Sequence, residues 1–267
     1  MKNYFYAIIG LFILNSCSTN PYRLGAKSYK KQLKVFQKTI GNTSSKPLQN
    51  GSNPKWISTV NFNLRKPNFV VIHHTAQDSL QQTLKTFTLT KTQVSAHYVI
   101  SDDGTVVQML NDYLRAWHGG NASWGKNTDI NSASIGIELD NNGIEPFSEA
   151  QINSLLALLN RIKKDYNIPT ANIIAHSDIA PSRKSDPSTL FPWKNLAELG
   201  FGFWPEDQLE KAPDYFNVEQ ALRIIGYNTQ NLSSAIKAFK LHYIQTEVDD
   251  ILDEKTINTL YSIYKKQ

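Results

Sequence analysis

The stretch FVVIHHTA, residues 69–76, is an apolar run that ends in two adjacent histidines, His73 and His74. Residues 69–72 are apolar at every position, which is typical of a central strand buried on both faces. Neighbouring side chains of a strand point to opposite faces, so the two rings cannot serve one site in the same way. The pattern predicts that one of these histidines lies at a site, and alternation alone does not choose between them.

Three further segments predict strands beside this one. AHYVISDDGTVVQML, residues 96–110, predicts two strands joined by an Asp-Gly turn. In SIGIELD, residues 134–140, apolar side chains alternate with Gly136 and Glu138, which is typical of a strand with one face in the core. Residues 172–175 predict a short strand that also ends in a histidine, His176.

Two helices are expected between these strands. Asp78 or Ser79 can cap the first. Ser148 and Gln151 predict a capping box at the start of the second, which ends before Pro169. The apolar side of that second helix consists of Ile152, Leu155, Leu159 and Ile162.

These elements predict an α/β domain over residues 56–204, in which helices flank a mixed central sheet. After Pro205 the composition changes, and residues 205–267 predict a small three-helix domain. Its helical patterns are VEQALRIIGY, SSAIKAFKLHY and DEKTINTLYSIY, and we expect His242 in the second pattern to be structural. A module of about sixty residues is marginally stable alone.

The first seventeen residues, MKNYFYAIIGLFILNSC, predict a secretory signal, because their apolar run is too short for a typical membrane span. LNSC resembles the lipobox of bacterial lipoproteins, which implies that Cys17 is lipidated and becomes the first residue. The alternative is an ordinary signal peptide with an incidental cysteine. Residues 18–55 are polar and predict a linker, with a short helix around residues 30–40.

Charge and cysteine content limit the classes of partner. The net charge of +5 is a mild excess that suits an acidic polymer or an anionic membrane surface. The absence of an arginine-rich stretch or a basic aromatic stripe argues against nucleic-acid binding. Cys17 is the only cysteine, so the chain cannot form an intrachain disulfide.

Two predicted strands that end in histidines indicate a metal site, because strand ends of an α/β sheet present side chains at one edge. HSDIAPSRKSDPSTLFPW, residues 176–193, is expected to be a loop, and it holds Asp178, Lys184 and Asp186. Two histidines and one carboxylate would leave the fourth position of a zinc ion open, which is the catalytic arrangement. From spacing alone, the alternative that both histidines are pocket or core residues stays open.

Five motifs carry a resemblance to a known family. IHHTA, SAHYVISDDGTVVQML, AWHGG, SIGIELD and HSDIAPSRKSDPSTLFPW occur in the order and spacing typical of zinc-dependent N-acetylmuramoyl-L-alanine amidases. The resemblance covers residues 68–204. It is strongest to outer-membrane lipoprotein amidases of Gram-negative bacteria, and residues 205–267 resemble the peptidoglycan-binding module that those proteins carry. The alternative for these residues is a helical cap that stabilises the catalytic domain.

The resemblance implies a zinc ion held by His73, His176 and Asp186, with Glu138 as the general base and Lys184 as the stabiliser of the transition state. Amide hydrolysis at a metal site requires these residue types, since a carboxylate must move a proton and a cation must stabilise the oxyanion. The alternatives are a half-exposed strand carboxylate at Glu138 and a solvated loop lysine at Lys184.

Further residues near the motifs have weaker assignments. His118 in AWHGG resembles part of a substrate groove, and Trp117 is a candidate platform for sugar stacking or a loop anchor. We expect His97 to be packed or to support the site, and Asp178 to bond the backbone of its own turn. His74 has no assigned role.

The implied function is hydrolysis of the amide bond between N-acetylmuramic acid and L-alanine in peptidoglycan or muropeptides. The enzyme is expected to be a monomer, anchored by lipid to the outer membrane and facing the periplasm, since Ser18 after Cys17 favours that membrane. One alternative is a non-catalytic peptidoglycan-recognition protein, against which the full ligand set and Glu138 argue. The other is a zinc peptidase that cleaves a different amide.

Overall fold

The computed structural model describes residues 20–41, 49, 64 and 66–267, and the chain divides into two compact units, Met1–Val60 and Asn61–Gln267. The predicted signal peptide with Cys17, and most of the predicted linker, lie outside the described residues. The described part of the first unit forms helix α1 (Arg23–Ile40), which begins earlier than the helix predicted around residues 30–40. Within the described ranges, no helix combines the length and apolarity that crossing a membrane requires.

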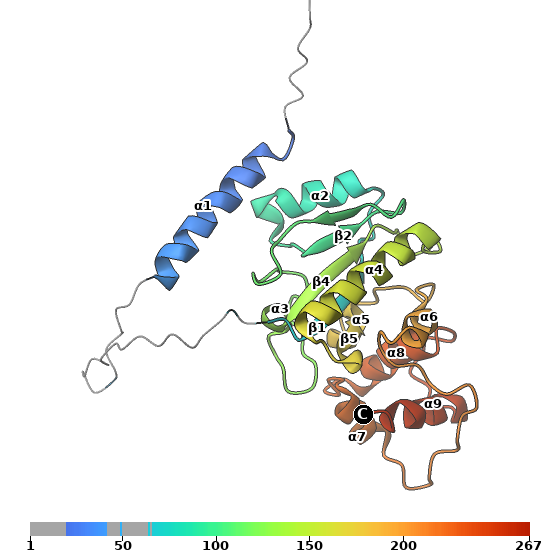
Figure 1. Ribbon diagram of the computed structural model, residues 1–267. Coiled ribbons are helices and arrows are strands. Elements are labelled where there is room, and N and C mark those ends of the chain that lie inside the picture. The colour runs from blue at the N-terminus through green and yellow to red at the C-terminus, as the bar shows by residue number, and fades with distance from the viewer. Residues whose placement is uncertain (1–19, 42–48, 50–63, 65) are drawn as a thin grey trace, which may run out of the picture. The chain divides into compact units, whose positions relative to one another are not determined.

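The second unit is built on a five-stranded mixed sheet of strand order β3-β2-β4-β1-β5 (Figure 1). The strands are β1 (Phe69–His74), β2 (Tyr98–Ile100), β3 (Val106–Gln108), β4 (Ser134–Leu139) and β5 (Ile173–Ala175). β1 lies between β4 and β5 and is parallel to both, β2 is parallel to β4, and the β2–β3 hairpin is antiparallel. The predicted mixed sheet, hairpin and central strand are confirmed.

Strand β1 is buried on both faces, which explains its unbroken apolar run. Val70 and Ile72 join one hydrophobic core beneath helix α4 (Glu149–Tyr166). Val71 points the other way, into a second core that contains residues of the C-terminal helices. A strand covered on both faces has no solvent side on which polar residues would be favoured.

The N-terminus of α4 forms only half of the predicted capping box. The Ser148 side chain accepts the backbone N–H of Gln151, as expected. The Gln151 side chain does not return the bond; it donates to the carbonyl oxygens of Ile100 and Asp140. Gln151 is buried, so its side-chain amide needs acceptors within the protein, and these two carbonyl oxygens provide them.

Shorter helices connect these elements. Helix α2 begins after Ser79, and the Ser79 side chain caps it by accepting the backbone N–H of Gln82. Of the two predicted caps, Asp78 and Ser79, the structure has Ser79. The segment after His176 starts with one helical turn, α5, where a loop was expected. The remaining bounds are α2 (Leu80–Thr88), η1 (Thr90–Thr92), α3 (Ile130–Ala133), η2 (Thr170–Asn172), α5 (His176–Ile179) and α6 (Trp193–Glu198).

The last sixty residues form the three predicted helices, α7 (Val218–Ile225), α8 (Leu232–Tyr243) and α9 (Glu254–Tyr264). Their apolar faces share the second core with the sheet, because Leu222, Phe239 and Leu260 belong to the same cluster as Val71 and Ile174. The predicted domain boundary between residues 204 and 205 stays a prediction. Residues on both sides of this boundary pack together in the second core.

Candidate metal and catalytic site

Three buried side chains meet at the carboxyl ends of β1 and β5. His73 lies near the end of β1, His176 follows β5 as the first residue of α5, and Asp186 lies in the loop beyond. The Nδ1 atoms of His73 and His176 are 2.8 Å apart. Asp186 Oδ2 lies 3.0 Å from Nδ1 of His176 and 3.3 Å from Nδ1 of His73. The structure therefore brings the three residues predicted as ligands together.

The three converging atoms fit one divalent metal ion. Tetrahedral zinc with bonds of about 2.0–2.1 Å holds neighbouring ligand atoms about 3.3 Å apart. The separations in the triad are close to that value. Nε2 of His176 lies 3.3 Å from the carbonyl oxygen of Gly119, which keeps the proton on that nitrogen and leaves Nδ1 free to bind a metal.

The ring nitrogen of His73 that faces away from the triad forms a hydrogen bond with His118. Nε2 of His73 lies 3.0 Å from Nδ1 of His118, and Nε2 of His118 lies 3.0 Å from the Ser134 hydroxyl. Burial and the neighbouring imidazoles hold the pKa of His118 well below its ordinary value. Burial, together with the neighbouring His176, lowers the pKa of His73 to about 4. Both rings are therefore neutral, as ligation by His73 requires.

The glycine of SIGIELD makes room for His118. A Cβ built on Gly136 would lie 2.4 Å from Cγ of the His118 ring, closer than real contacts allow. The ring is buried against β4 and His73, so it does not line an open groove. We therefore propose that His118 positions His73, in place of the predicted contact with substrate.

Glu138 lies beside the triad, because β1 and β4 pair His73 with Glu138 in register. Its Oε2 atom is shielded from solvent and has no hydrogen-bond partner among the described residues. Burial, together with the negative charge of Asp186, raises the pKa of Glu138 to about 8, and Lys184 opposes that rise. A bound cation would act in the same direction as Lys184 and favour the carboxylate form.

Lys184 and Trp117 lie at the surface around the site. Lys184 is exposed, and its charge lowers the pKa of both His73 and Glu138. Trp117 is 52% exposed, and its backbone N–H donates to the Ser95 side chain. These positions leave both side chains accessible to a large substrate.

The remaining histidines of the domain have structural contacts. Nδ1 of His74 accepts the backbone N–H of Ser188, and a Cβ on Gly143 would lie 2.7 Å from its ring, so His74 packs between two loops beside the triad. Nδ1 of His97 accepts the backbone N–H of Gly136, and its Nε2 donates to a carbonyl oxygen. The prediction that His97 is a packed residue is confirmed.

Two residues that the sequence did not single out hold the AWHGG loop. The Asn131 side chain accepts the backbone N–H groups of His118 and Gly119. The Arg183 guanidinium donates to the carbonyl oxygens of Gly119 and Asn121. Arg183 belongs to the motif that holds Lys184 and Asp186, whereas Asn131 stands in a segment without any periodic pattern, so only Arg183 had a sequence signal.

Asp178 connects the site to the C-terminal helices. One carboxylate oxygen accepts the backbone N–H of Ala175, which confirms the predicted bond within its own turn. The same oxygen lies 2.7 Å from Nδ1 of His242, and the other accepts the Tyr227 hydroxyl at 2.6 Å. His242 also stacks on Trp193, with ring centroids 3.9 Å apart.

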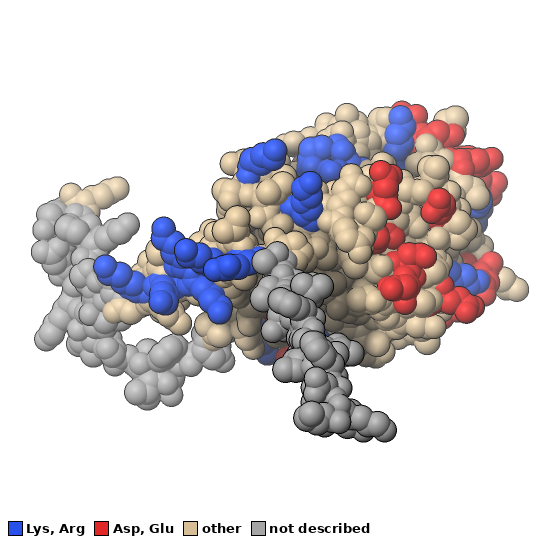
Figure 2. Space-filling model, turned by 90° about the horizontal axis from the view of Figure 1, so that it is seen from above, with Lys and Arg blue, Asp and Glu red and all other residues tan. Residues whose placement is uncertain are grey.

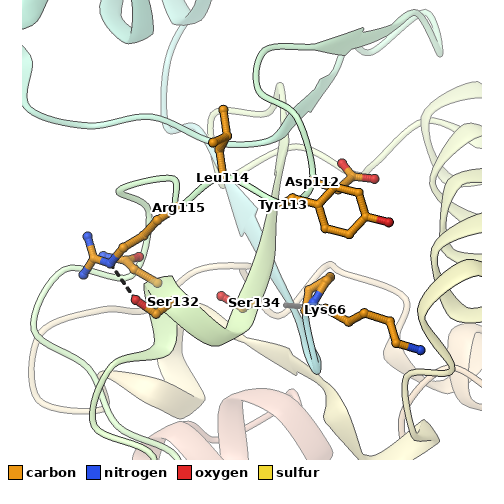
Figure 3. A pocket seen from close by; sticks show the side chains of 9 residues that line it. Lys66, Asp112, Tyr113, Leu114, Arg115, Ser132 and Ser134 are labelled. Atoms are coloured by element: carbon orange, nitrogen blue, oxygen red, sulfur yellow. Dashed lines mark hydrogen bonds between the residues drawn. The ribbon is translucent and has the colours of Figure 1, made fainter. Parts of the chain in front are cut away.

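A separate hollow of about 160 Å³ lies at the opposite end of β4, next to Ser134, the strand's first residue (Figure 3). Arg115 crosses its wall and donates to the Ser132 hydroxyl. None of the triad residues lines this hollow, so it is not the site of the chemistry. Its lining consists of Lys66, Pro67, Asp112, Tyr113, Leu114, Arg115, Asn131, Ser132 and Ser134.

A buried His-His-Asp triad with a neighbouring carboxylate, on an α/β sheet, is typical of metal-dependent hydrolases. Comparison with known proteins narrows this class. Residues 63–189 match the family described as N-acetylmuramoyl-L-alanine amidase. The chain is 35% identical over 219 residues to the N-acetylmuramoyl-L-alanine amidase AmiD of Escherichia coli (strain K12). The aligned region covers 70% of this chain and 78% of AmiD. The chain belongs to the N-acetylmuramoyl-L-alanine amidase family.

Solved structures agree with this assignment. A complex of AmiD from E. coli with the substrate anhydro-N-acetylmuramic acid-L-Ala-D-gamma-Glu-L-Lys superposes with a TM-score of 0.69 at 30% identity, over 82% of this chain and 97% of that chain. AmpDh3 from Pseudomonas aeruginosa in complex with anhydromuramic pentapeptide gives a TM-score of 0.68 at 29% identity, over 79% and 96%. Both matches extend beyond the sheet domain, because each covers more than three quarters of this chain.

Proposed function

We propose that this chain hydrolyses the amide bond between N-acetylmuramic acid and L-alanine in peptidoglycan or its muropeptide fragments. The observation that carries the proposal is the convergence of His73, His176 and Asp186 beside Glu138, in a chain of the amidase family. The similarity to AmiD in complex with an anhydro-muropeptide supports this substrate class.

The cofactor of this proposal is zinc. His73 and His176 would each contribute Nδ1, and Asp186 one carboxylate oxygen. Nitrogen and oxygen donors in this ratio suit Zn²⁺, and three protein ligands leave one position for water or substrate. When bound, zinc would supply a Lewis acid that polarises the scissile carbonyl and lowers the pKa of water to about 7.

The chain's own residues would move the proton and stabilise charge. Glu138 accepts a proton from the attacking water as the water oxygen bonds to the lactyl carbonyl carbon. It returns that proton to the nitrogen of L-alanine as the C–N bond breaks, which leaves a carboxylate on the sugar and an amine on the peptide. Lys184 offsets the negative charge that develops on the carbonyl oxygen. Trp117, a half-exposed residue of the AWHGG motif, is the proposed platform for stacking of a sugar ring.

We further propose that Cys17 carries a lipid that anchors the protein to the outer membrane, so that the enzyme faces the periplasm. The LNSC motif supports this location. The module of residues 205–267 would bind peptidoglycan, which raises the local concentration of substrate without a new contact at the reaction site. A monomer suffices for the reaction, since every proposed ligand belongs to one chain.

Product masses test the proposal directly. The chain from Ser18 onward, which retains every residue the structure describes, is incubated with intact peptidoglycan and with anhydro-muropeptides. We expect free stem peptides with an L-alanine amine, loss of activity with a chelator, and recovery with Zn²⁺. Glu138→Gln serves as the matched inactive control. Cleavage within the peptide, with the muramyl amide intact, would indicate a peptidase. Zinc binding without turnover on any substrate would indicate a recognition protein.

A further inference from the structure

Helix α1 carries all of its charge on one side and in one sign. Between Arg23 and Ile40 the sequence contains basic residues and no Asp or Glu. At 100° per residue these basic side chains fall within one face of the helix. They are Arg23, Lys27, Lys30, Lys31, Lys34 and Lys38. Figure 2 shows Lys and Arg side chains gathered on the described segment that lies between grey stretches.

A continuous apolar stripe follows the helix on a different face. Its members recur at spacings of three and four residues, which places them one above another. None of the helix residues is buried, and Phe36 and Ile40 are 47% and 79% exposed. The stripe consists of Ala26, Tyr29, Leu33, Phe36 and Ile40.

A second copy of the chain is a poor partner for this stripe. The spacing extends over only about two heptads, fewer than the three or four that a coiled coil needs. A neighbouring copy would bring a second set of like charges beside the first, with no acidic residue on the helix to pair with them. The observations favour a partner that is apolar at depth and negatively charged at its surface.

We propose that α1 lies in the plane of an anionic phospholipid membrane, with the stripe inserted among the acyl chains and the basic face toward the headgroups. A charged face rich in Lys and Arg, an aromatic and aliphatic face opposite, and a low overall hydrophobicity are the features of interfacial helices. Arg23 follows Cys17 by six residues, so a lipid on Cys17 would hold the helix at the surface.

Vesicle binding by the unlipidated protein tests this inference and does not depend on amidase activity. The chain from Ser18 onward is sedimented with vesicles of phosphatidylcholine alone or of phosphatidylcholine with phosphatidylglycerol. We expect binding to the anionic vesicles that falls steeply as salt rises, and weak binding to the neutral ones.

Paired variants separate the two faces of the helix. Replacing Lys27, Lys30, Lys31 and Lys34 by Gln should weaken the partition onto anionic vesicles by about 600-fold, since each basic residue near the surface contributes about fivefold. The control replaces four exposed lysines of the second unit by Gln and should bind as before. These control lysines are Lys126, Lys164, Lys211 and Lys255.

The apolar stripe has its own matched pair. Phe36→Asn lies on the stripe and should weaken binding at least about tenfold, because a buried aromatic side chain contributes strongly to transfer from water. Val35→Asn, one residue away, 55% exposed and off the stripe, should change it little. Equal loss in both variants, or equal binding to neutral and anionic vesicles, would overturn the proposal. So would retention on purified peptidoglycan without any on vesicles, or self-association that depends on Phe36.

Discussion

Nε2 of His73 and Nδ1 of His118 lie 3.0 Å apart, which makes one hydrogen bond the link between the metal triad and the interior of the sheet. If Nδ1 of His73 binds a metal, Nε2 carries the proton and donates to His118. The proton of His118 is then on Nε2 and donates to Ser134, whose hydroxyl donates to the carbonyl oxygen of Ile130. Each donor has one acceptor, so the chain of bonds fixes the tautomer of His73.

His118→Ala should therefore weaken zinc binding by about 10–100-fold, the usual effect of losing a partner that orients a ligand histidine. Ser134→Ala should cost less, because His118 stays in contact with His73. The measurement is the zinc affinity, obtained by competition with a chelator. Trp117→Ala, which alters an exposed side chain outside this chain of bonds, should bind zinc normally.

The burial of His118 requires a check on folding. His118→Gln keeps a polar side chain of similar length, and circular dichroism shows whether each variant is folded. If folded His118→Ala bound zinc as tightly as the parent chain, His118 would have no positioning role.

Glu138→Gln should keep zinc and lose turnover by about 10²–10⁴-fold, because the amide cannot accept a proton from water. His176→Ala should lose both zinc and turnover, since it removes a ligand atom. Zinc content by elemental analysis and product formation by mass spectrometry separate the two outcomes. Full activity of Glu138→Gln would assign the base to another residue.

The strands, the hairpin and the meeting of two strand-end histidines were predictable because they depend on local patterns. Phe69 to Ile72 indicated a strand covered on both faces, and β1 has cores on both sides. The two strand-end histidines indicated a shared edge, and the parallel pairing of β1 and β5 provides it. The resemblance then chose His73 over His74, in agreement with the distances in the triad.

Contacts between distant segments were not predictable. Nothing local in AWHGG says that His118 turns inward, since that depends on the space above Gly136, eighteen residues later. Gln151 was expected to complete a capping box, and its side chain instead donates to the carbonyl oxygens of Ile100 and Asp140, 51 and 11 positions away. Asp178 has partners 49 and 64 residues away, and no spacing rule relates them.

The metal-free protein should lose stability as the pH falls from 7 toward 5. Burial lowers the pKa of His73, His97 and His118, so below about 6.5 the unfolded chain binds protons that the folded chain does not. Glu138 acts in the opposite direction. The pKa of Glu138 is raised from 4.5 to about 8, so Glu138 contributes stability at low pH. That contribution is lost as the pH rises from about 4.5 to about 8.

Burial also lowers the pKa of His74 and raises that of Asp140, so four histidines act against two carboxyl groups and the acid-side loss should dominate. Urea unfolding with a chelator present, at pH 7, 6 and 5, measures the free energy of unfolding. In Glu138→Gln the opposing contribution is gone, so the decline toward pH 5 should be steeper than in the parent chain. A flat profile in both proteins would mean that the folded and unfolded chains bind the same number of protons across this pH range, so that neither the histidines nor Glu138 have shifted pKa values.

The hydrogen bond from Tyr227 to Asp178 predicts that the C-terminal helices unfold together with the sheet. Asp178 is fully buried, and Tyr227→Phe removes one of its donors, which should lower the free energy of unfolding by about 1–3 kcal/mol. Tyr215→Phe is the matched control, because Tyr215 is 89% exposed and its loss should change stability by less than about 0.5 kcal/mol. Urea unfolding followed by near-ultraviolet and far-ultraviolet circular dichroism should give one coincident transition in all three proteins, since α7–α9 share a core with β1 and β5. Two transitions, with only the smaller one shifted by Tyr227→Phe, would instead make the last sixty residues an independent module whose contacts with Asp178 do not support the site.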